Sequence, residues 1–352
     1  MKKIIHCDAD CFFAAVEMRD DPSLRHVPMA IGGSVERRGV ISTCNYEARR
    51  FGVHSAMASW QALKLCPSLV LLPHNMEKYR QASSALKSIF SDYSEIIEMV
   101  SVDEAYLDVT DTDLCRGSAT LIAREIRNRV RSEIGITVSA GVATNKFLAK
   151  VASEWHKPDG LYVIKPGDEK AFVDNLPIKY IHGVGKVTAA KLARLGISHC
   201  QELQQKSLAE LACHFGSFAV RLKALSQGID DRPVNTTRIR KSLSVEHTFT
   251  ADLAGRDSCL SQTGWLCGEL MARLKKLPAF YQVKKIQVKL KFANFSQTTL
   301  EKPCDTPTVA CFSDLIAEGT ARNPLPVRLL GVGVQFMPPP SLSMVEQLRL
   351  FA

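Results

Sequence analysis

Three acidic residues stand in apolar surroundings at two places in the chain. Asp103 and Glu104 are adjacent within residues 101–109, a segment that otherwise has the pattern of a buried strand, and Asp8 ends the apolar run 4–7. Ionised carboxylates are costly to remove from water unless a cation neutralises them. If the two segments are neighbouring strands, these carboxylates predict an oxygen-rich site for Mg²⁺. The alternative is that Asp103 and Glu104 belong to a polar hairpin turn.

The adjacency of the two acids constrains their backbone. Neighbouring side chains on a regular strand point to opposite faces, so a straight strand cannot aim both at one site. We therefore expect a bend or a distortion at Asp103 and Glu104, beside Asp8. The same alternation turns His6 to the same face as Asp8. We regard His6 only as a possible neighbour of Asp8 and assign no protein residue as a general base.

Length and charge indicate several domains and a polyanionic partner. The 352 residues exceed the size at which a single core keeps growing, so about two to four domains are expected. The formal net charge is +9, and residues 236–352 hold 15 lysines and arginines against 9 acidic residues. Excess positive charge in the last third favours a partner such as nucleic acid.

Cysteine usage and hydropathy bear on the compartment. None of the 11 cysteines forms a Cys-x-x-Cys pair, which argues against a zinc knuckle or a redox motif. No apolar run approaches the roughly 18 residues of a membrane span, and no signal-peptide pattern follows the first methionine. We expect a cytoplasmic protein with reduced thiols, most of them structural, and no membrane association.

Strand and helix patterns alternate through the first 160 residues. A small, basic-edged subdomain is expected early in these 160 residues. The turn at 157–160 ends the α+β unit as a whole. Arg124, Arg127 and Arg131 favour a solvated helix face over a binding patch. The whole reads as an α+β layer, with helices packed on a sheet. Strands are expected at 4–7, 28–31, 39–43 and 136–143, with two more across 96–109, and helices at 11–18 with Asp10 as its N-cap, at 76–93, at 118–135 and from 144 onward.

A glycine turn joins two helical segments beyond residue 165. Gly183 and Gly185 flank Val184, Lys186 follows them, and the second helix is expected at 188–195. Backbone N–H groups at a helix N-terminus beside a lysine can hold a phosphate, although such turns also serve packing alone.

The last third reads as a linker followed by a separate module. Residues 230–240 are polar, contain a proline and lack periodicity, which predicts a linker. A strand is expected at 283–292 with Lys285, Lys289 and Lys291 on one face. We favour contact of these lysines with a nucleic-acid backbone; the alternative is that they protect an edge strand from aggregation.

The chain ends in a short apolar peptide after a spacer that contains proline and serine. An apolar tail that cannot join a core is typical of a ligand for another protein's groove. The alternative is a tail that folds back on its own domain. The residues that carry this prediction are Gln347, Leu348, Leu350 and Phe351.

Several blocks, in the same order along the chain, resemble the motifs of the Y-family translesion DNA polymerases. The resemblance covers essentially the whole chain. One departure is His182, where the family commonly has proline; it leaves both glycines of the turn intact. The blocks are DADCFFAAVE at 8–17, NYEAR at 45–49, SVDEAY at 101–106, SAGVA at 139–143, NK-LAK across 145–150, KPDG at 157–160 and the turn at 181–185.

The resemblance implies an α+β multidomain fold. Its parts are a palm with a mixed or antiparallel sheet and helices (1–19 and 74–165), a small fingers insertion (20–73), a helical thumb with a helix-hairpin-helix (166–230), a linker (231–241), a C-terminal α/β little finger (242–340) and a clamp-binding tail (341–352).

The resemblance also implies a reaction. It is template-directed, low-fidelity DNA synthesis on a primer 3′-hydroxyl without a proofreading exonuclease, by phosphoryl transfer with two Mg²⁺ ions in the active site. The resemblance makes Asp8, Asp103 and Glu104 catalytic, with the carbonyl of Ala9 completing the metal ligands. Nucleotide contacts fall to Phe12, Phe13, Thr43, Tyr46, Arg49 and Lys157, with Phe13 as the steric gate that rejects ribonucleotides.

The implied partners are primer–template DNA, deoxynucleoside triphosphates and a sliding clamp, bound by a monomer. DNA contacts are expected at Gly183, Gly185, Lys186, Lys285, Lys289 and Lys291, and clamp contacts at the four tail residues named above. Two other classes stay open. A nucleotide cyclase shares a palm-like sheet with acids but needs neither the glycine turn nor the tail, and a non-catalytic DNA-repair protein would not need three grouped carboxylates.

Overall fold

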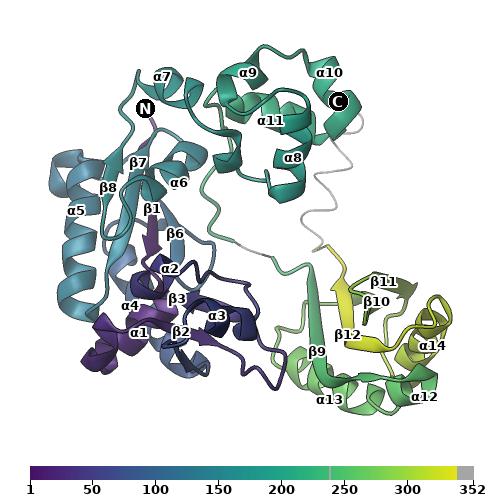
Figure 1. The fold of residues 1–352 in the computed structure, drawn as a ribbon. Coiled ribbons are helices and arrows are strands. Elements are labelled where there is room, and N and C mark those ends of the chain that lie inside the picture. Colours follow the sequence, from purple (N-terminus) through teal and green to yellow (C-terminus); the bar gives the residue numbers. More distant parts are fainter. Residues whose placement is uncertain (238, 339–352) are drawn as a thin grey trace. The chain divides into compact units, whose positions relative to one another are not determined.

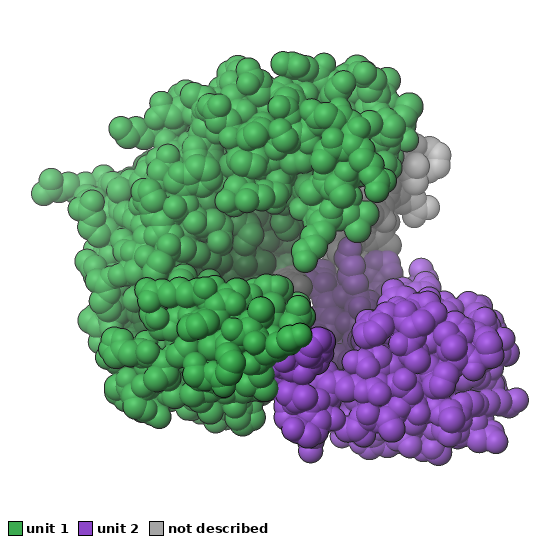
Figure 2. Space-filling view, viewed as in Figure 1, with its two compact units in different colours: residues 1–32, 41–57, 61–237 green, residues 33–40, 58–60, 238–352 purple. Residues whose placement is uncertain are grey.

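The computed structural model describes residues 1–237 and 239–338, and the chain divides into two compact units (Figure 2). Unit 1 comprises residues 1–32, 41–57 and 61–237. Unit 2 comprises residues 33–40 and 58–60 together with the chain from residue 238 onward. In the described ranges no helix has both the length and the apolar character to cross a membrane.

The larger sheet of unit 1 has β1 at its centre (Figure 1). β1 pairs antiparallel with β6 on one side and β7 on the other, while β7 and β8 pair parallel. The expectation that the two acid-bearing strands are neighbours is therefore confirmed. The strand order is β5 (Ile96–Met99), β6 (Glu104–Asp108), β1 (Ile4–Ala9), β7 (Val138–Ala143) and β8 (Leu161–Val163).

The two faces of this sheet carry different side chains. Ile5, Cys7 and Ala9 of β1 join a buried cluster with helices α1 (Phe12–Asp20), α4 (Met76–Ser91) and α5 (Ala119–Arg129). Strand alternation turns His6 and Asp8 to the other face, which α6 (Lys146–Trp155) covers. The polar residues of β1 thus share one side of the sheet.

Gly141 on β7 allows α6 to lie directly on that face. A Cβ at this position would meet the carbonyl oxygen of Ala149 at 2.0 Å and the backbone nitrogen of Ser153 at 2.3 Å. Only glycine fits such a close approach of a helix backbone to a strand. The approach brings α6 against His6, the residue opposite Gly141 in the β1–β7 pairing.

A second, three-stranded sheet in unit 1 has the order β3 (Ile41–Cys44), β2 (Met29–Gly32) and β4 (Val70–Leu72). Helix α2 (Tyr46–Arg50) begins directly after β3, and α3 (Ser59–Leu65) precedes β4. Asn45 caps α2 by accepting a hydrogen bond from the backbone of Ala48 at 2.9 Å, and its amide donates to the carbonyl of Val27. This cap fixes the first turn of α2 on the sheet.

Five short helices form the last part of unit 1. Gly183, in the turn before α8, has a φ of 96°, and the ring of Phe218 lies 3.0 Å from where its Cβ would be. Both conditions require glycine. The helices are α7 (Glu169–Asp174), α8 (Lys186–Arg194), α9 (Cys200–Gln204), α10 (Leu208–Phe215) and α11 (Phe218–Ser226), with a 3₁₀ turn at Ile178–Tyr180.

The segment expected to be a linker begins as a bonded strap. Asp230 accepts a hydrogen bond from the backbone of Phe147 at 3.0 Å, and the backbone of Asn235 donates to Glu98 at 2.7 Å. Val234 is buried in the same cluster as α6. Residues 230–235 are thus held on the face of the large sheet that carries Asp8.

Unit 2 contains a four-stranded antiparallel sheet with helices on one face. The order is β11 (Gln297–Pro303), β10 (Val283–Phe292), β12 (Val327–Phe336) and β9 (Ser242–Leu253). Helices α12 (Gly255–Leu260), α13 (Thr263–Leu274) and α14 (Val309–Ala321) cover the apolar face. The alternation expected for 283–292 is present, because Ile286, Val288, Leu290 and Phe292 are all buried.

Three local predictions were wrong. Asp10 does not cap the first helix: Cys11 occupies the N-cap position with a left-handed backbone, and Asp10 is bonded elsewhere. Arg127 is not on a solvated face, since it donates to the carbonyl of Val138 and pairs with Asp159. The helix after the glycine turn begins at Lys186, two residues earlier than expected.

Candidate active site

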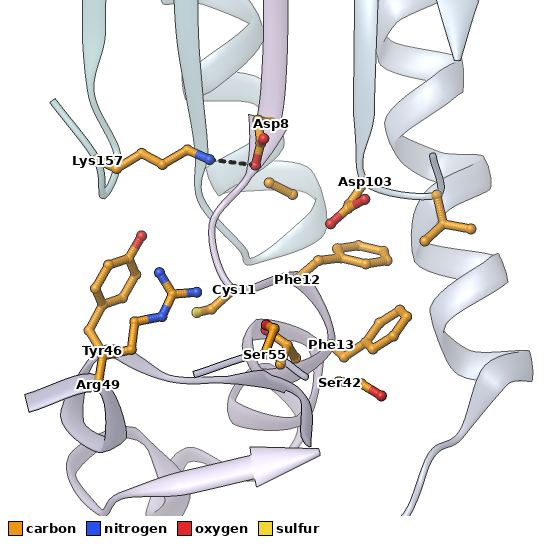
Figure 3. Close-up of a pocket in the computed structure, with 13 residues that line it drawn as sticks. Asp8, Cys11, Phe12, Phe13, Ser42, Tyr46, Arg49, Ser55, Asp103 and Lys157 are labelled. Carbon is orange, nitrogen blue, oxygen red and sulfur yellow. Dashed lines mark ion pairs between the residues drawn. The ribbon is translucent and has the colours of Figure 1, made fainter. Parts of the chain in front are cut away.

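A cavity of about 240 Å³ opens in unit 1 at the end of β1 (Figure 3). Its walls come from β1, α1, β3, α2, the bend before β6 and the turn after α6. Nine of the residues predicted for metal or nucleotide contact line it: Asp8, Ala9, Phe12, Phe13, Thr43, Tyr46, Arg49, Asp103 and Lys157. The other lining residues are Cys11, Ser42, Ser55 and Val102.

Asp8 and Lys157 form an ion pair at one end of this cavity. The Lys157 Nζ atom lies 2.8 Å from Asp8 Oδ1, and the two side chains are 18% and 16% exposed (Figure 3). Burial raises the pKa of Asp8 to about 6, although Lys157 opposes the rise. The ammonium group of Lys157 therefore supplies the positive charge beside the desolvated carboxylate of Asp8.

Asp103 lies in the expected bend. The backbone carbonyl of Asp103 accepts a hydrogen bond from the N–H of Ala9 at 2.9 Å, and the N–H of Val100 donates to the carbonyl of Glu104, also at 2.9 Å. The Asp103 side chain accepts a hydrogen bond from the hydroxyl of Ser101. The bend thus fixes Asp103 directly beside the end of β1.

Glu104 lies opposite Asp8 in the β1–β6 pairing but binds other partners. Its Oε1 atom lies 2.8 Å from His6 Nε2 and forms an ion pair with Lys150 of α6. The opposite ring nitrogen of His6 lies 2.7 Å from the hydroxyl of Ser153. Glu104 is not among the residues that line the cavity.

The partners of Glu104 set the charges of this group. Burial works to raise the pKa of Glu104, but it is outweighed by the hydrogen bond from His6, the charge that His6 carries at acid pH, and the interaction with Lys150, which hold the pKa near 2. Burial lowers the pKa of His6 to about 4. At neutral pH a neutral His6 therefore donates to an ionised Glu104.

Asp10 joins the parts that surround the cavity. It is 2% exposed, and its carboxylate accepts hydrogen bonds at 2.8 Å from Thr137, from Ser139 and from the backbone of Asp159. Burial raises the pKa of Asp10, against these hydrogen bonds. Asp159 belongs to the turn that carries Lys157, so Asp10 links the end of β1 to the lysine that faces Asp8.

Aromatic and cationic side chains line the opposite end of the cavity. The ring of Phe13 is stacked on Tyr79 with centroids 4.2 Å apart, and the Tyr79 hydroxyl donates to Glu17 at 2.8 Å. Arg49 lies 4.6 Å above the ring of Tyr46, one helical turn away on α2. Phe13 is thus held at the wall, and the guanidinium is available to an anion.

The donor set fits a divalent cation only when a substrate completes it. In residues 1–237 and 239–338 no three His, Cys, Asp or Glu side chains are already grouped for a metal ion. Asp8 and Asp103 nevertheless line one cavity with Ala9. Mg²⁺ is commonly held by one or two carboxylates together with waters and substrate phosphates, which these residues allow.

The residues predicted to bind DNA lie outside the cavity. Gly185 caps α8 and Lys186 is its first residue, next to the turn at Gly183. Lys289 pairs with Glu246 at 3.0 Å, Lys285 pairs with Glu301, and Lys291 Nζ lies 4.8 Å from the centre of the Phe295 ring. The tail residues Gln347, Leu348, Leu350 and Phe351 lie outside the described residues.

Sequence reasoning missed several contributors. Ser42 and Ser55 line the cavity without a charge or a spacing that distinguishes them from other serines. Lys150 and Ser153 lie one turn apart on α6, so both reach the group around Glu104. Their helical spacing, directly after a strand, is the sequence pattern that could have predicted this. The role of Asp10 was missed because its three partners at 2.8 Å lie more than 120 residues away.

Known families match the chain over both units. The impB/mucB/samB family matches residues 7–154, its C-terminal domain matches residues 240–349, and the thumb domain of DNA polymerase-iota matches residues 179–230. The fold is similar to a chimera of the Y-family DNA polymerases Dbh and Dpo4, with a TM-score of 0.86 and 29% identity over 95% of this chain and 98% of that chain. The chain belongs to the Y-family translesion DNA polymerases, DNA-directed enzymes that generally use divalent metal ions.

Individual relatives within this family match nearly the whole chain. DNA polymerase IV of Ralstonia nicotianae is 54% identical over 337 residues, which cover 95% of this chain and 94% of the relative. DNA polymerase IV of Ectopseudomonas mendocina is 52% identical over 351 residues, 100% of this chain and 99% of the relative. An insertion ternary complex of Dbh DNA polymerase matches with a TM-score of 0.67 and 28% identity, over 95% of this chain and 99% of that chain. The chain is therefore similar over nearly its whole length to DNA polymerase IV of these bacteria, in agreement with the translesion family that its motifs resemble.

Proposed function

We propose that this enzyme extends a primer 3′-hydroxyl with deoxynucleotides, on a DNA template, by phosphoryl transfer with two Mg²⁺ ions and without a proofreading exonuclease. The observation that carries the proposal is the single cavity that holds Asp8, Asp103, Lys157 and Arg49. Carboxylates for metal ions and cations for a triphosphate within one cavity are what this reaction requires. The ternary complex of a related polymerase supports the same substrates.

Each residue of the candidate site has a proposed role. Asp8 and Asp103, with the carbonyl of Ala9, would hold the metal ions, and these would supply positive charge to the reacting oxygens. Glu104 serves the primer side, positioned by its bond to His6. Arg49 and Lys157 bind the phosphates of the nucleotide, and Arg49 suits a bidentate contact. The nucleotide also contacts Phe12, Phe13, Thr43 and Tyr46.

We propose the domain limits of the Y family for this chain: palm 1–19 and 74–165, fingers 20–73, thumb 166–230, linker 231–241, little finger 242–340 and tail 341–352. Gly183, Gly185 and Lys186 contact a DNA backbone from the thumb, as do Lys285, Lys289 and Lys291 from the little finger. The excess of positive charge in residues 236–352 supports this assignment.

A primer-extension assay tests the function. The full chain is incubated with primer–template DNA, Mg²⁺ and the four deoxynucleoside triphosphates, with chelator in a parallel reaction. We expect stepwise extension that requires Mg²⁺ and the template, misinsertion opposite undamaged bases, and no shortening of a mismatched primer. Nucleotide cyclisation, or DNA binding without extension, would instead favour one of the two competing classes.

Phe13 is proposed as the steric gate against ribonucleotides. Its ring is fixed against Tyr79 at the cavity wall, so it can exclude a 2′-hydroxyl by contact. Phe13→Val should raise ribonucleotide incorporation at least about tenfold relative to deoxynucleotide incorporation. Competing incorporation of the two sugars measures this ratio, with Phe51→Val, an exposed residue, as the control. An unchanged sugar preference would remove Phe13 from this role.

The C-terminal peptide is proposed to bind a sliding clamp, and the enzyme itself to be a monomer. Deleting residues 347–352 should leave extension without the clamp unchanged, because the cavity lies in unit 1. The deletion should abolish the increase in product length that a clamp gives. Equal stimulation of the truncated chain would show that the tail serves its own domain instead.

A further inference from the structure

Two cysteines of unit 2 are in contact at the edge of its core. Cys304 follows β11, and its backbone N–H donates to the carbonyl of Lys284 at 3.3 Å, which continues the pairing with β10. Cys311 lies in the first turn of α14. Both side chains are half-buried against the same apolar core of unit 2, and each thiol affects the charge state of the other.

The surroundings of Cys311 favour its thiolate. The hydroxyl of Thr308, the N-cap of α14, donates to Cys311 Sγ at 3.1 Å, while the N–H of Cys311 donates to the same hydroxyl at 3.3 Å. The bond from the Thr308 hydroxyl, foremost, and the backbone of Thr308 lower the pKa of Cys311. A thiol near a helix N-terminus is stabilised as an anion in the same way. Burial, foremost, raises the pKa of Cys304.

The remaining cysteines offer no comparable pair. Cys115 donates to Glu125 at 3.1 Å, and that hydrogen bond raises its pKa. Cys213 is exposed on α10. Across the parts of the chain that the structure describes, Cys311 is the cysteine whose pKa is lowered. Seven others are buried: Cys7, Cys11, Cys44, Cys66, Cys200, Cys259 and Cys267.

A metal site does not account for the pair. In the described ranges no three His, Cys, Asp or Glu side chains are placed to hold a metal ion, and a structural zinc needs four such ligands. Thiol chemistry is what remains. An activated thiolate beside a second, less acidic thiol is the arrangement that forms a disulfide in two exchange steps.

We propose that Cys304 and Cys311 form a modification site at which a low-molecular-weight disulfide of the glutathione class produces an intramolecular disulfide. The Cys311 thiolate attacks one sulfur of the small disulfide, forms a mixed disulfide and expels the first small thiolate. Cys304 gives its proton to solvent and attacks Cys311 Sγ, which expels the second. The two protein thiols lose two electrons, and the small disulfide takes them up as it becomes two thiols.

This site is separate from the polymerase chemistry, because both cysteines belong to unit 2 and the cavity belongs to unit 1. The bridge would close a loop of eight residues and link the end of β11 to the first turn of α14. The six residues between the cysteines explain why a search for Cys-x-x-Cys could not find the pair.

The test treats the full chain with oxidised glutathione at pH 7. After acid quenching and alkylation, mass spectrometry follows peptide 292–322, which contains both cysteines, and the peptide that contains Cys213. We expect the link between Cys304 and Cys311 to form at least about tenfold faster than glutathione adds to Cys213. Dithiothreitol should reverse the link.

Three variants identify the steps. Cys304→Ser should accumulate the mixed disulfide at Cys311, Cys311→Ser should abolish the rapid reaction, and Cys213→Ser should leave it unchanged. Thermal melting checks that each variant is folded, and the wild-type measurement stands without them. A stable glutathione adduct on wild-type Cys311, or equal reaction rates at Cys311 and Cys213 without the link, would overturn the proposal.

Discussion

Asp8 and Glu104 face each other across one strand pairing but differ in charge behaviour. Asp8 has one strong partner, Lys157, and burial raises its pKa from 3.8 to about 6. Glu104 is half-buried, but His6 and Lys150 together hold its pKa near 2. Burial works in the same direction for both acids, so the number of partners decides the difference.

The difference separates two tasks within the site. Asp8 lines the cavity, and Lys157 compensates its negative charge only in part. This favours the binding of a further cation together with the substrate. Glu104 is already ionised and held, so it presents a fixed carboxylate. We infer that the Asp8 side responds to ligand, while His6, Ser153 and Lys150 set the position of the Glu104 side in advance.

The pKa shifts have opposite effects on stability. The folded-state pKa of Asp8 lies above its unfolded value of 3.8, so its contribution to stability is present below pH 3.8 and is lost as the pH rises through about 6. The folded-state pKa of His6, about 4, lies below its unfolded value of 6.5. Its contribution is therefore present above pH 6.5 and is lost as the pH falls through about 4.

Of the substitutions that separate Asp8 from Glu104, Lys157→Met should have the larger effect on nucleotide incorporation. It removes the cation that lowers the pKa of Asp8, so that pKa should rise further above 6. The variant also loses a phosphate contact. Nucleotide incorporation at pH 7 should fall about 10- to 100-fold and recover in part at higher pH. Incorporation rates from pH 6 to pH 9 measure this, with the exposed Lys165→Met as the control. A profile equal to that of the wild type would break the proposed link between Lys157 and Asp8.

His6→Phe should have a smaller effect, on the other carboxylate. The substitution removes the bonds to Glu104 and Ser153 and raises the pKa of Glu104, because the hydrogen bond from His6 lowers it. Incorporation should fall about tenfold. His6→Gln, which keeps a donor, should restore part of the rate, whereas a defect of packing alone would leave both variants equally impaired. The loss of stability as the pH falls from 6.5 to 4 should disappear in both.

Sequence patterns located the site because its chemistry is local. The two acid-bearing strands and their bend follow from short motifs whose charges contradict their apolar surroundings, whereas the nucleotide-contact residues of the cavity were expected from the family resemblance. Family resemblance then indicated the α+β multidomain fold, which the comparisons confirm. Local patterns suffice where a residue's role depends on its own strand or turn.

The rest depended on contacts between distant segments. Asp10 was assigned to a helix cap because it directly precedes the helix expected at 11–18, yet at 2.8 Å it binds Thr137 just before β7, Ser139 on β7 and the turn before β8. Arg127 has helical neighbours typical of a solvated face, but Asp159 and the carbonyl of Val138 bind it. No periodicity along one helix reports a partner on another element.

The most direct test of the account is single-nucleotide incorporation by Asp103→Ala on saturating primer–template DNA with Mg²⁺. The matched control is Asp111→Ala, because Asp111 is an exposed acid just after β6, whereas Asp103 lies just before it. We expect a loss of at least about 1,000-fold for Asp103→Ala, with DNA affinity within a few-fold of the wild type and the control unaffected. Incorporation by Asp103→Ala at the rate of the control would contradict the assignment of the metal site to Asp8 and Asp103.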